Sequence, residues 1–236
     1  MNATFRRLLL PGLMSLGLIA VMLGLGFWQL QRMAWKQEIL VQIDRAEGGI
    51  ARPLSANPTP FSKVSLRGVL RHARVAYYGA DIQLTPAGPK MGARLIVPLD
   101  RADGPPVLID RGWVPIEQLR PISLPSGPVT IEGFVRPPEY PHWFSAADDL
   151  VARRFYTLNA QAIGAALGVG NVAPFVTVAP FVIVALGQRP AEMYPVPALR
   201  IPRPTNDHLN YAITWFGLAL ILAIIFVIYA RNAGRQ

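Results

Sequence analysis

The chain has no cysteine among its 236 residues. Disulfide bonds, thiol catalysis, cysteine-based zinc or copper sites and covalent c-type haem attachment are therefore excluded. Histidine is scarce as well: only His72, His142 and His208 occur, and no two of them have the spacing of a metal-binding motif. Charged residues make up only 16% of the chain, against 52% for hydrophobic ones. The distribution of the apolar residues is therefore the first guide to what kind of protein this is.

Motifs of the common enzyme classes are absent too. The chain has no H-E-x-x-H, no G-x-S-x-G, no P-loop and no G-x-G-x-x-G pattern. Acidic residues such as Asp100, Asp103 and Asp110 fall in predicted turns or at strand ends, where aspartate commonly stabilises the turn. No basic run is interleaved with aromatic residues, as nucleic-acid binding would favour. No group of residues in the sequence therefore indicates an enzyme, and nothing indicates nucleic-acid binding.

Two long runs carry no charged residue, residues 8–30 and residues 211–230. A helix of about 20 residues spans the roughly 30 Å hydrocarbon core of a bilayer. The alternative for the first run is a cleaved signal peptide, but the run is long and ends at Trp28 and Arg32, not at small residues. The alternative for the second run, a buried core helix, is disfavoured by the aromatic residues at both its ends. We predict transmembrane helices at residues 8–30 and 209–230.

The charges of the two tails predict the orientation of these helices. The N-terminal tail holds Arg6 and Arg7, the C-terminal tail holds Arg231 and Arg235, and neither tail holds an acid. The positive-inside rule places both tails in the cytoplasm and the domain between the spans, residues 31–207, on the other side. Since no Arg-rich presequence precedes the first span, we expect a bacterial inner (cell) membrane, with the central domain in the periplasm.

The region between the spans has the pattern of β structure. Strand-like alternation or short β-prone apolar runs occur at residues 62–78, 93–99, 106–114 and 129–135. Residues 79–90 are predicted to be a loop and residues 160–167 a helix. Pro180 lies within the apolar run 175–186 and favours two short strands or a bulged edge there. The predicted fold class is a membrane protein in which two transmembrane helices flank a mostly antiparallel, barrel-like β domain with about one helix.

The formal charge of +9 leaves the domain between the spans clearly basic, because the tails carry only four of the arginines. Anionic lipid head groups or propionate-bearing ligands are possible partners for such a surface. The alternative is a basic surface that simply faces solvent.

His208 differs from the other two histidines in lying just before the second apolar run. On a helix it shares a face with Tyr211 and Trp215. A neutral imidazole flanked by aromatic rings at a membrane surface is able to ligate haem iron. The alternative is an interfacial histidine near a helix start, with the aromatic residues as membrane anchors.

The first helix carries a second candidate surface. Gly24, Trp28, Arg32 and Lys36 fall on one stripe at i+4 spacing. Gly24 would permit close approach of another helix, and the other three would form a cationic, aromatic shelf at the membrane surface. The alternative for each of the long side chains is a snorkelling anchor.

Three segments resemble, in order, the three signatures of the surfeit locus protein 1 family: GFWQLQR at residues 26–32, DRGWVP at 110–115 and NDHLNYAITWF at 206–216. The segment GARLIVPL at residues 92–99 also fits its usual place. The resemblance covers nearly the whole chain, although residues 168–186 are less similar.

The resemblance implies an assembly factor of respiratory-chain biogenesis, a chaperone for cytochrome c oxidase that helps to place haem a in the catalytic subunit. His208 matches the histidine proposed as the iron ligand, and Tyr211, Trp215, Trp28 and Arg32 are the expected contacts of the transiently bound haem a. The implied partners are the oxidase catalytic subunit with its assembly intermediates and a haem a donor, besides the lipid bilayer. Two alternatives remain: a membrane scaffold that stabilises an oxidase assembly intermediate without binding haem, and an enzyme with an unrecognised periplasmic site.

Overall fold

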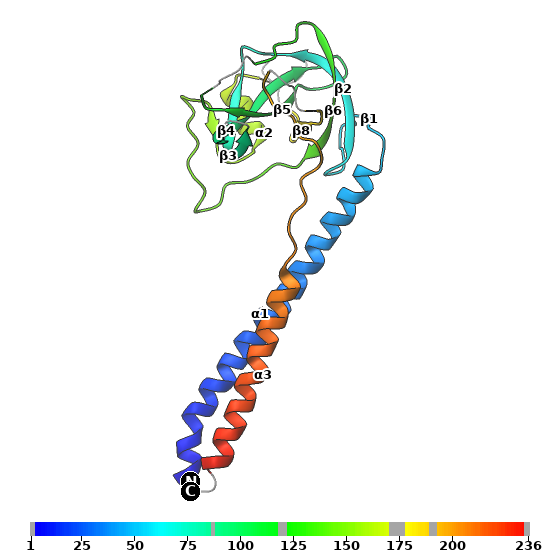
Figure 1. Cartoon of the computed structure of the whole chain (residues 1–236). Helices are drawn as coiled ribbons and strands as arrows, with labels where there is room; N and C mark the ends of the chain where they lie inside the picture. Colours follow the sequence, from blue (N-terminus) through cyan, green and yellow to red (C-terminus); the bar gives the residue numbers. More distant parts are fainter. Residues whose placement is uncertain (1–2, 86–87, 118–121, 170–177, 189–192, 234–236) are drawn as a thin grey trace. The chain divides into compact units, whose positions relative to one another are not determined.

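The computed structural model describes residues 3–85, 88–117, 122–169, 178–188 and 193–233 (Figure 1). The chain divides into two compact units. The helical unit comprises Met1–Val41 and Arg203–Gln236, and the β unit comprises Gln42–Pro202. Each unit has its own internal packing, so each is described separately.

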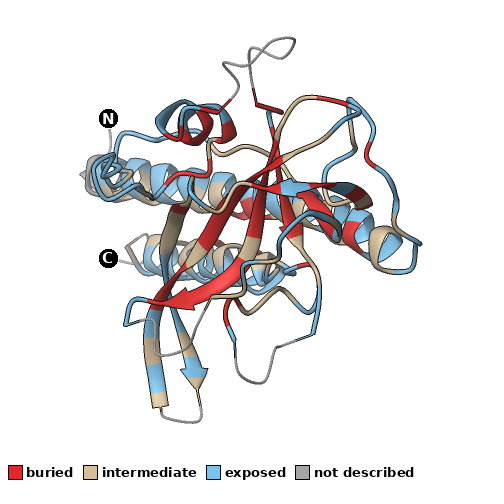
Figure 2. Ribbon diagram, turned by 90° about the horizontal axis from the view of Figure 1, so that it is seen from above, coloured by how far each residue is buried: buried red, intermediate tan, exposed pale blue. Residues whose placement is uncertain are grey.

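Two long helices build the helical unit, α1 (Ala3–Glu47), whose last turns belong to the β unit, and α3 (His208–Ala233). Both are long and apolar enough to cross a bilayer. Their surfaces are largely exposed, as lipid-facing helices would be, whereas the buried residues concentrate on the strands (Figure 2). α1 ends just before Gly48, whose N–H donates to the carbonyl of Asp44 at 3.1 Å.

The β unit contains eight strands and one short helix among its described residues. In chain order they are β1 (Arg52–Pro53), β2 (Lys63–Leu70), β3 (Ala76–Thr85), β4 (Gly88–Asp100), β5 (Val107–Pro115), β6 (Pro128–Arg136), β7 (Arg154–Phe155), α2 (Ala160–Ala166) and β8 (Val182–Ala185). The strands follow the order β1-β2-β6-β8-β5-β4-β3-β7, and β2 also pairs with β4. That extra pairing closes β2, β6, β8, β5 and β4 into a ring. Within the ring only β5 and β8 run parallel, so the unit is a small and mostly antiparallel barrel.

Alternation along the ring strands separates two hydrophobic clusters. One cluster takes Leu95, Val97 and Leu99 from β4 together with inward residues of the other ring strands. The second takes the intervening Ile96 with residues of α2 such as Ile163. The barrel therefore has a filled interior, and α2 covers part of its outer face. Asn159 caps α2 by accepting a bond from Ala162 N–H at 3.0 Å.

The predicted fold class is confirmed: two apolar terminal helices flank a mostly antiparallel, barrel-like β domain. The predicted strands at 93–99 and 129–135 fall within β4 and β6, and that at 106–114 and the helix at 160–167 match β5 and α2 to within one residue at each end.

Two local predictions are wrong. Residues 79–85 and 88–90, the described part of the predicted loop 79–90, are strand, because β3 continues to Thr85 and β4 begins at Gly88. Gly79 has φ +72° and lies where the β3–β4 register shifts, so this glycine marks a bulge. Of the two alternatives for residues 175–186, the bulged edge is wrong, because β8 pairs with β5 on one side and β6 on the other. Pro180 lies just before β8 and removes no donor from it, while residues 175–177 of that predicted run lie outside the described residues.

Candidate functional site

A group of polar contacts within the helical unit joins α1 to the start of α3. On α1, the side chains of Gln29 and Lys36 and the carbonyl of Met33 take part, and these residues lie three or four positions apart on one face of the helix. Lys36 Nζ donates to the carbonyl of Thr205 at 2.7 Å, and Asn206 Nδ2 donates to that of Met33 at 3.2 Å. The third contact pairs Gln29 with His208. We call this set the polar clasp: Gln29, Met33, Lys36, Thr205, Asn206 and His208.

His208 is the histidine of the polar clasp, and its two ring nitrogens lie in different surroundings. Nδ1 lies 2.6 Å from Gln29 Oε1. Because an amide oxygen only accepts, Nδ1 carries a proton, and in the neutral imidazole Nε2 then keeps its lone pair. Nε2 is buried and has no hydrogen-bond partner among the described residues. The polar clasp therefore selects one tautomer of neutral His208 and leaves Nε2 without a partner.

Below the polar clasp, toward the chain termini, the two helices pack through small residues against Phe216. A Cβ added at Gly26 would lie 2.6 Å from the Phe216 ring, and the rings of Phe27 and Phe216 meet edge to face at 5.4 Å. Ala212 and Ala219, on the same face of α3 as Phe216, are buried. The expectation that Gly24 permits the close approach is wrong, since a Cβ there would meet nothing within 4 Å. Gly26, two residues further on, does so.

Most of the other predicted site residues are exposed, although Tyr211 and Trp215 lie on the same face of α3 as His208. Trp28 and Tyr211 are half or more exposed, with exposed fractions of 50% and 58%. Arg32 is exposed and lies over the ring of Trp35, at 4.5 Å from its centroid. No hydrogen bond or ring contact joins Trp28, Tyr211 or Trp215 to His208 in the part of the chain that the structure describes. These aromatic residues have the exposure of membrane-interface anchors.

The segment DRGWVP, residues 110–115, makes several buried contacts within the β unit. Asp110 is fully buried, forms an ion pair with Arg94 and accepts a bond from Gly112 N–H at 3.0 Å. Gly112 has φ +124°, and a Cβ there would collide with the carbonyl of Val196. Trp113 is buried and donates from Nε1 to the carbonyl of Asp81 at 3.1 Å. The register of β4 and β5 shifts between Arg94 and Ile96, so this segment forms a β-bulge.

Comparison with known proteins identifies the family of this chain. The model of the SURF1 family matches residues 16–220, a range that contains all three signature segments. The chain belongs to the SURF1 family. It is 28% identical over 220 residues to a SURF1-like protein from Rickettsia conorii, covering 90% of this chain and 88% of that protein. It is 25% identical over 219 residues to surfeit locus protein 1 from Mus musculus, covering 84% of this chain and 69% of the mouse protein. SURF1 proteins are assembly factors of cytochrome c oxidase, not a family of catalysts.

Gln29 is the site residue of this SURF1 chain that the sequence analysis did not single out. It lies inside the first signature and is the only amide side chain in residues 8–30. A polar side chain in an apolar membrane segment generally faces another helix and has a function. This rule could have identified Gln29 from the sequence, although it does not identify His208 as its partner.

Proposed function

We propose that this SURF1 chain is a membrane-anchored assembly factor that binds haem a through His208 and aids its insertion into the catalytic subunit of cytochrome c oxidase. The observation that carries the proposal is the unpartnered Nε2 of His208, whose lone pair is preserved by the bond between Nδ1–H and Gln29. A neutral imidazole of this tautomer is the form that binds iron.

The donor set fits haem better than a free metal ion. Within the described residues, no three His, Asp or Glu side chains come together in a way that would hold a metal ion. Haem iron already has four porphyrin nitrogens, so one histidine from the protein would be enough to hold it. His208 would bind the iron, Gln29 would orient the imidazole, and the bound group would add a redox-active, strongly absorbing centre. Trp28, Arg32, Tyr211 and Trp215 remain proposed contacts of its macrocycle and propionates.

The burial of Nε2 has a consequence for uptake and release. Iron reaches this nitrogen only when the side chains around it move. A hydrophobic porphyrin crosses water at high cost, so a carrier must take it up and hand it on without releasing it into solution. If iron binds only when the polar clasp rearranges, the cost of that rearrangement lowers the affinity for haem. A protein that passes haem on to the oxidase subunit needs such a moderate affinity.

The proposed setting is a bacterial inner membrane, with α1 and α3 as its two spans and the β unit in the periplasm. The apolar length of both helices and the bacterial origin of the Rickettsia relatives support this setting. The oxidase catalytic subunit, its assembly intermediates and a haem a donor are the proposed partners.

One observation favours a second function, a scaffold that stabilises an oxidase intermediate without binding haem. The polar clasp already joins α1 to α3 by three contacts, so a structural role alone explains Gln29, Asn206 and Lys36. The unsatisfied Nε2 is the feature that a scaffold role leaves without a purpose.

The test is to purify the full chain from cells that make haem a and to record its absorption spectrum, for the wild type and for His208→Ala. The wild type should carry haem a, and the variant should lose most of it while protein level and far-UV circular dichroism stay near normal. Added imidazole should partly restore the iron spectrum of the variant. His72→Ala and His142→Ala, both in the β unit, should keep their haem. A folded wild type without haem, or a His208→Ala protein with full haem and an unchanged spectrum, would favour the scaffold.

A further inference from the structure

The β unit contains a pocket that is separate in sequence from the polar clasp. Its volume is about 400 Å³, and it is lined by ring strands β4 and β5, by β3 and by the segment 149–156. Ala93 forms part of its floor and lies on the same face of β4 as the interior residue Leu95. The pocket therefore continues the apolar interior of the barrel outward.

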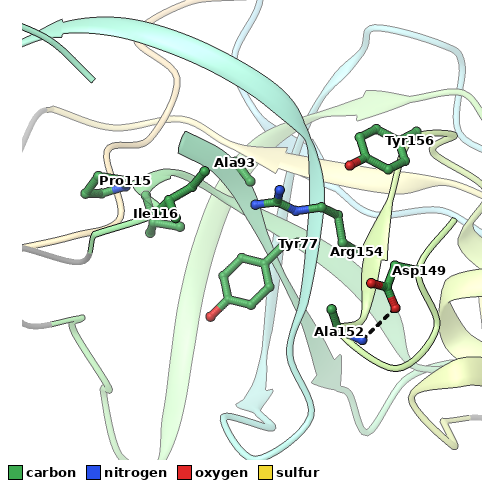
Figure 3. A pocket seen from close by; sticks show the side chains of 9 residues that line it. Tyr77, Ala93, Pro115, Ile116, Asp149, Ala152, Arg154 and Tyr156 are labelled. Carbon is green, nitrogen blue, oxygen red and sulfur yellow. Dashed lines mark hydrogen bonds between the residues drawn. The ribbon is translucent and has the colours of Figure 1, made fainter. Parts of the chain in front are cut away.

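The guanidinium of Arg154 points into this pocket between Ala93 and Tyr77 (Figure 3). Arg154 is partly buried, and its side chain has no hydrogen bond or ion pair with any residue that the structure describes. Asp149 also lines the pocket, but its carboxylate accepts a bond from Ala152 N–H at 2.9 Å (Figure 3) and forms no ion pair with Arg154. A partly desolvated cation without a counter-ion is costly unless a ligand supplies one.

The backbone holds Arg154 firmly in place. Arg154 and Asp149 exchange two backbone hydrogen bonds of 2.8 Å each, which close the loop between them. Arg154 also pairs with Tyr77 in the parallel contact between β7 and β3, and Asp148 accepts a bond from Tyr156 N–H at 2.7 Å. Arg153, next to it, has φ +51°, a conformation that non-glycine residues seldom adopt. These contacts fix the backbone from which the Arg154 side chain enters the pocket.

We infer that this pocket is a binding site for a single carboxylate carried on an aromatic or aliphatic body. The planar fork of Arg154 suits bidentate contact with a carboxylate. The nearby carboxylate of Asp149 disfavours a dianion such as phosphate, so a monoanion is the better match. The apolar part of the ligand packs on Ala93 and Ile116, and the hydroxyl of Tyr156, which has no partner among the described residues, supplies a further polar contact.

The carboxylate has two possible sources, a small organic acid or the C-terminus of a partner polypeptide. This inference does not rest on the proposed haem function, because all the residues involved lie in the β unit.

The experiment is isothermal titration calorimetry of the full chain in detergent micelles, with empty micelles as blank. The probes are 3-phenylpropionate and its uncharged amide, followed by the tripeptide acetyl-Ala-Ala-Phe with a free and with an amidated C-terminus. We expect saturable binding of one acid per chain and at least tenfold weaker binding of each amide. Tighter binding of the free tripeptide assigns a peptide partner, and tighter binding of phenylpropionate assigns a small acid.

Arg154→Gln should weaken acid binding at least tenfold, and Ile116→Trp, which fills the pocket without changing charge, should abolish it. Arg67→Gln makes the same charge change at an exposed position on β2 and should bind like the wild type. His208→Ala should also bind normally, so the result is independent of the haem proposal. The inference is overturned if the amides bind as well as the acids, if no probe binds the wild type, or if folded Arg154→Gln and Ile116→Trp proteins keep wild-type affinity.

Discussion

His208 and Gln29 are 179 residues apart in the chain, yet Nδ1 of the histidine lies 2.6 Å from Oε1 of the glutamine. Gln29 is therefore a positioning residue whose role can be tested separately from that of the proposed ligand. In Gln29→Leu the acceptor for Nδ1–H is lost, and the imidazole is no longer held in one tautomer. Loss of such an outer partner typically lowers metal affinity by about 10- to 100-fold.

We expect haem titration of Gln29→Leu to give an affinity lower by that factor, while the haem that remains bound keeps a histidine-ligated spectrum. Gln29→Glu retains an acceptor and should keep most of the affinity. Gln31→Leu changes an exposed residue of the same helix and serves as the control. Equal losses in the Gln29→Leu and Gln31→Leu proteins would rule out the positioning role.

Gly26 and Phe216 make a second contact of the helical unit that can be tested by mutation. A Cβ at Gly26 would lie 2.6 Å from the Phe216 ring, so Gly26→Ala forces the ring or the helix to move, at a cost of about 1–3 kcal/mol. SDS titration followed by circular dichroism should show the unfolding midpoint shifted to lower SDS. Gly24→Ala, where a Cβ meets nothing within 4 Å, should leave it unchanged or raise it slightly.

Adding Phe216→Ala to Gly26→Ala separates a steric clash from a general helix effect. If the clash is the cause, the second substitution should recover part of what the first one lost. Strictly additive losses would mean that the two residues do not act on each other.

The proposed orientation is open to a direct labelling test because the chain has no cysteine. A membrane-impermeant maleimide should label Arg67→Cys, an exposed position of the β unit, in cells whose outer membrane has been permeabilised. Gln236→Cys should be labelled only after the cells are broken, because its tail is predicted to be cytoplasmic. The reverse pattern would place the β unit in the cytoplasm.

The sequence predicted the elements of the helical unit better than their contacts. Charge-free length was enough to predict α1 and α3, because a bilayer sets one scale for every spanning helix. The face of α1 that contacts α3 was not predictable from the i+4 stripe through Gly24. The contact instead follows Gly26, Gln29 and Met33, at alternating spacings of three and four residues. One sequence holds no information on which residues of two distant helices meet.

In the β unit, too, the strands could be predicted from the sequence but their pairing could not. Local alternation predicted β4, β5 and β6, but ring closure depends on non-local pairs such as Leu70 with Leu99 and Ile109 with Ile183. The loop prediction fails at Gly79 because a glycine weakens the strand pattern in the sequence, whereas in the structure this glycine forms a bulge within β3. The unpaired Arg154 had no motif at all, since its pocket forms only when β7 pairs with β3.

Asp110 and Arg94 give a stability prediction for the β unit. Asp110 is fully buried and the side chain of Arg94 is 20% exposed, so Asp110→Ala leaves a largely buried positive charge unpaired. Removing one partner of such a pair typically costs about 3–5 kcal/mol. Urea denaturation of the full chain should show this loss in the free energy of unfolding of the β unit. Asp103→Ala, at a carboxylate that is 76% exposed, should cost about 1 kcal/mol or less, and similar losses at the two positions would contradict the prediction.

Glu139 predicts how the stability of the β unit depends on pH. Burial alone would raise the pKa of Glu139, but the bond from Leu158 N–H and the guanidinium of Arg136 outweigh it and hold this pKa below its ordinary value of 4.5. Leu158 N–H donates at 3.1 Å and Arg136 Nη2 at 2.7 Å, and the hydroxyl of Tyr78 donates as well. A lowered folded pKa means that the unfolded chain binds this proton more readily. The stabilisation is therefore complete above about pH 4.5 and is lost as the pH falls through the folded pKa.

Glu139→Gln removes the titrating group while keeping a similar shape. At pH 7 the variant should be less stable than the wild type to urea, because Arg136 loses its partner. The difference should shrink as the pH is lowered below 4.5, where the wild-type carboxylate begins to lose its own advantage. Glu132→Gln, at an exposed position on β6, makes the same change in net charge and controls for it. If the gap between Glu139→Gln and the wild type is the same at pH 7 and at pH 3.5, the carboxylate does not stabilise the fold through its charge.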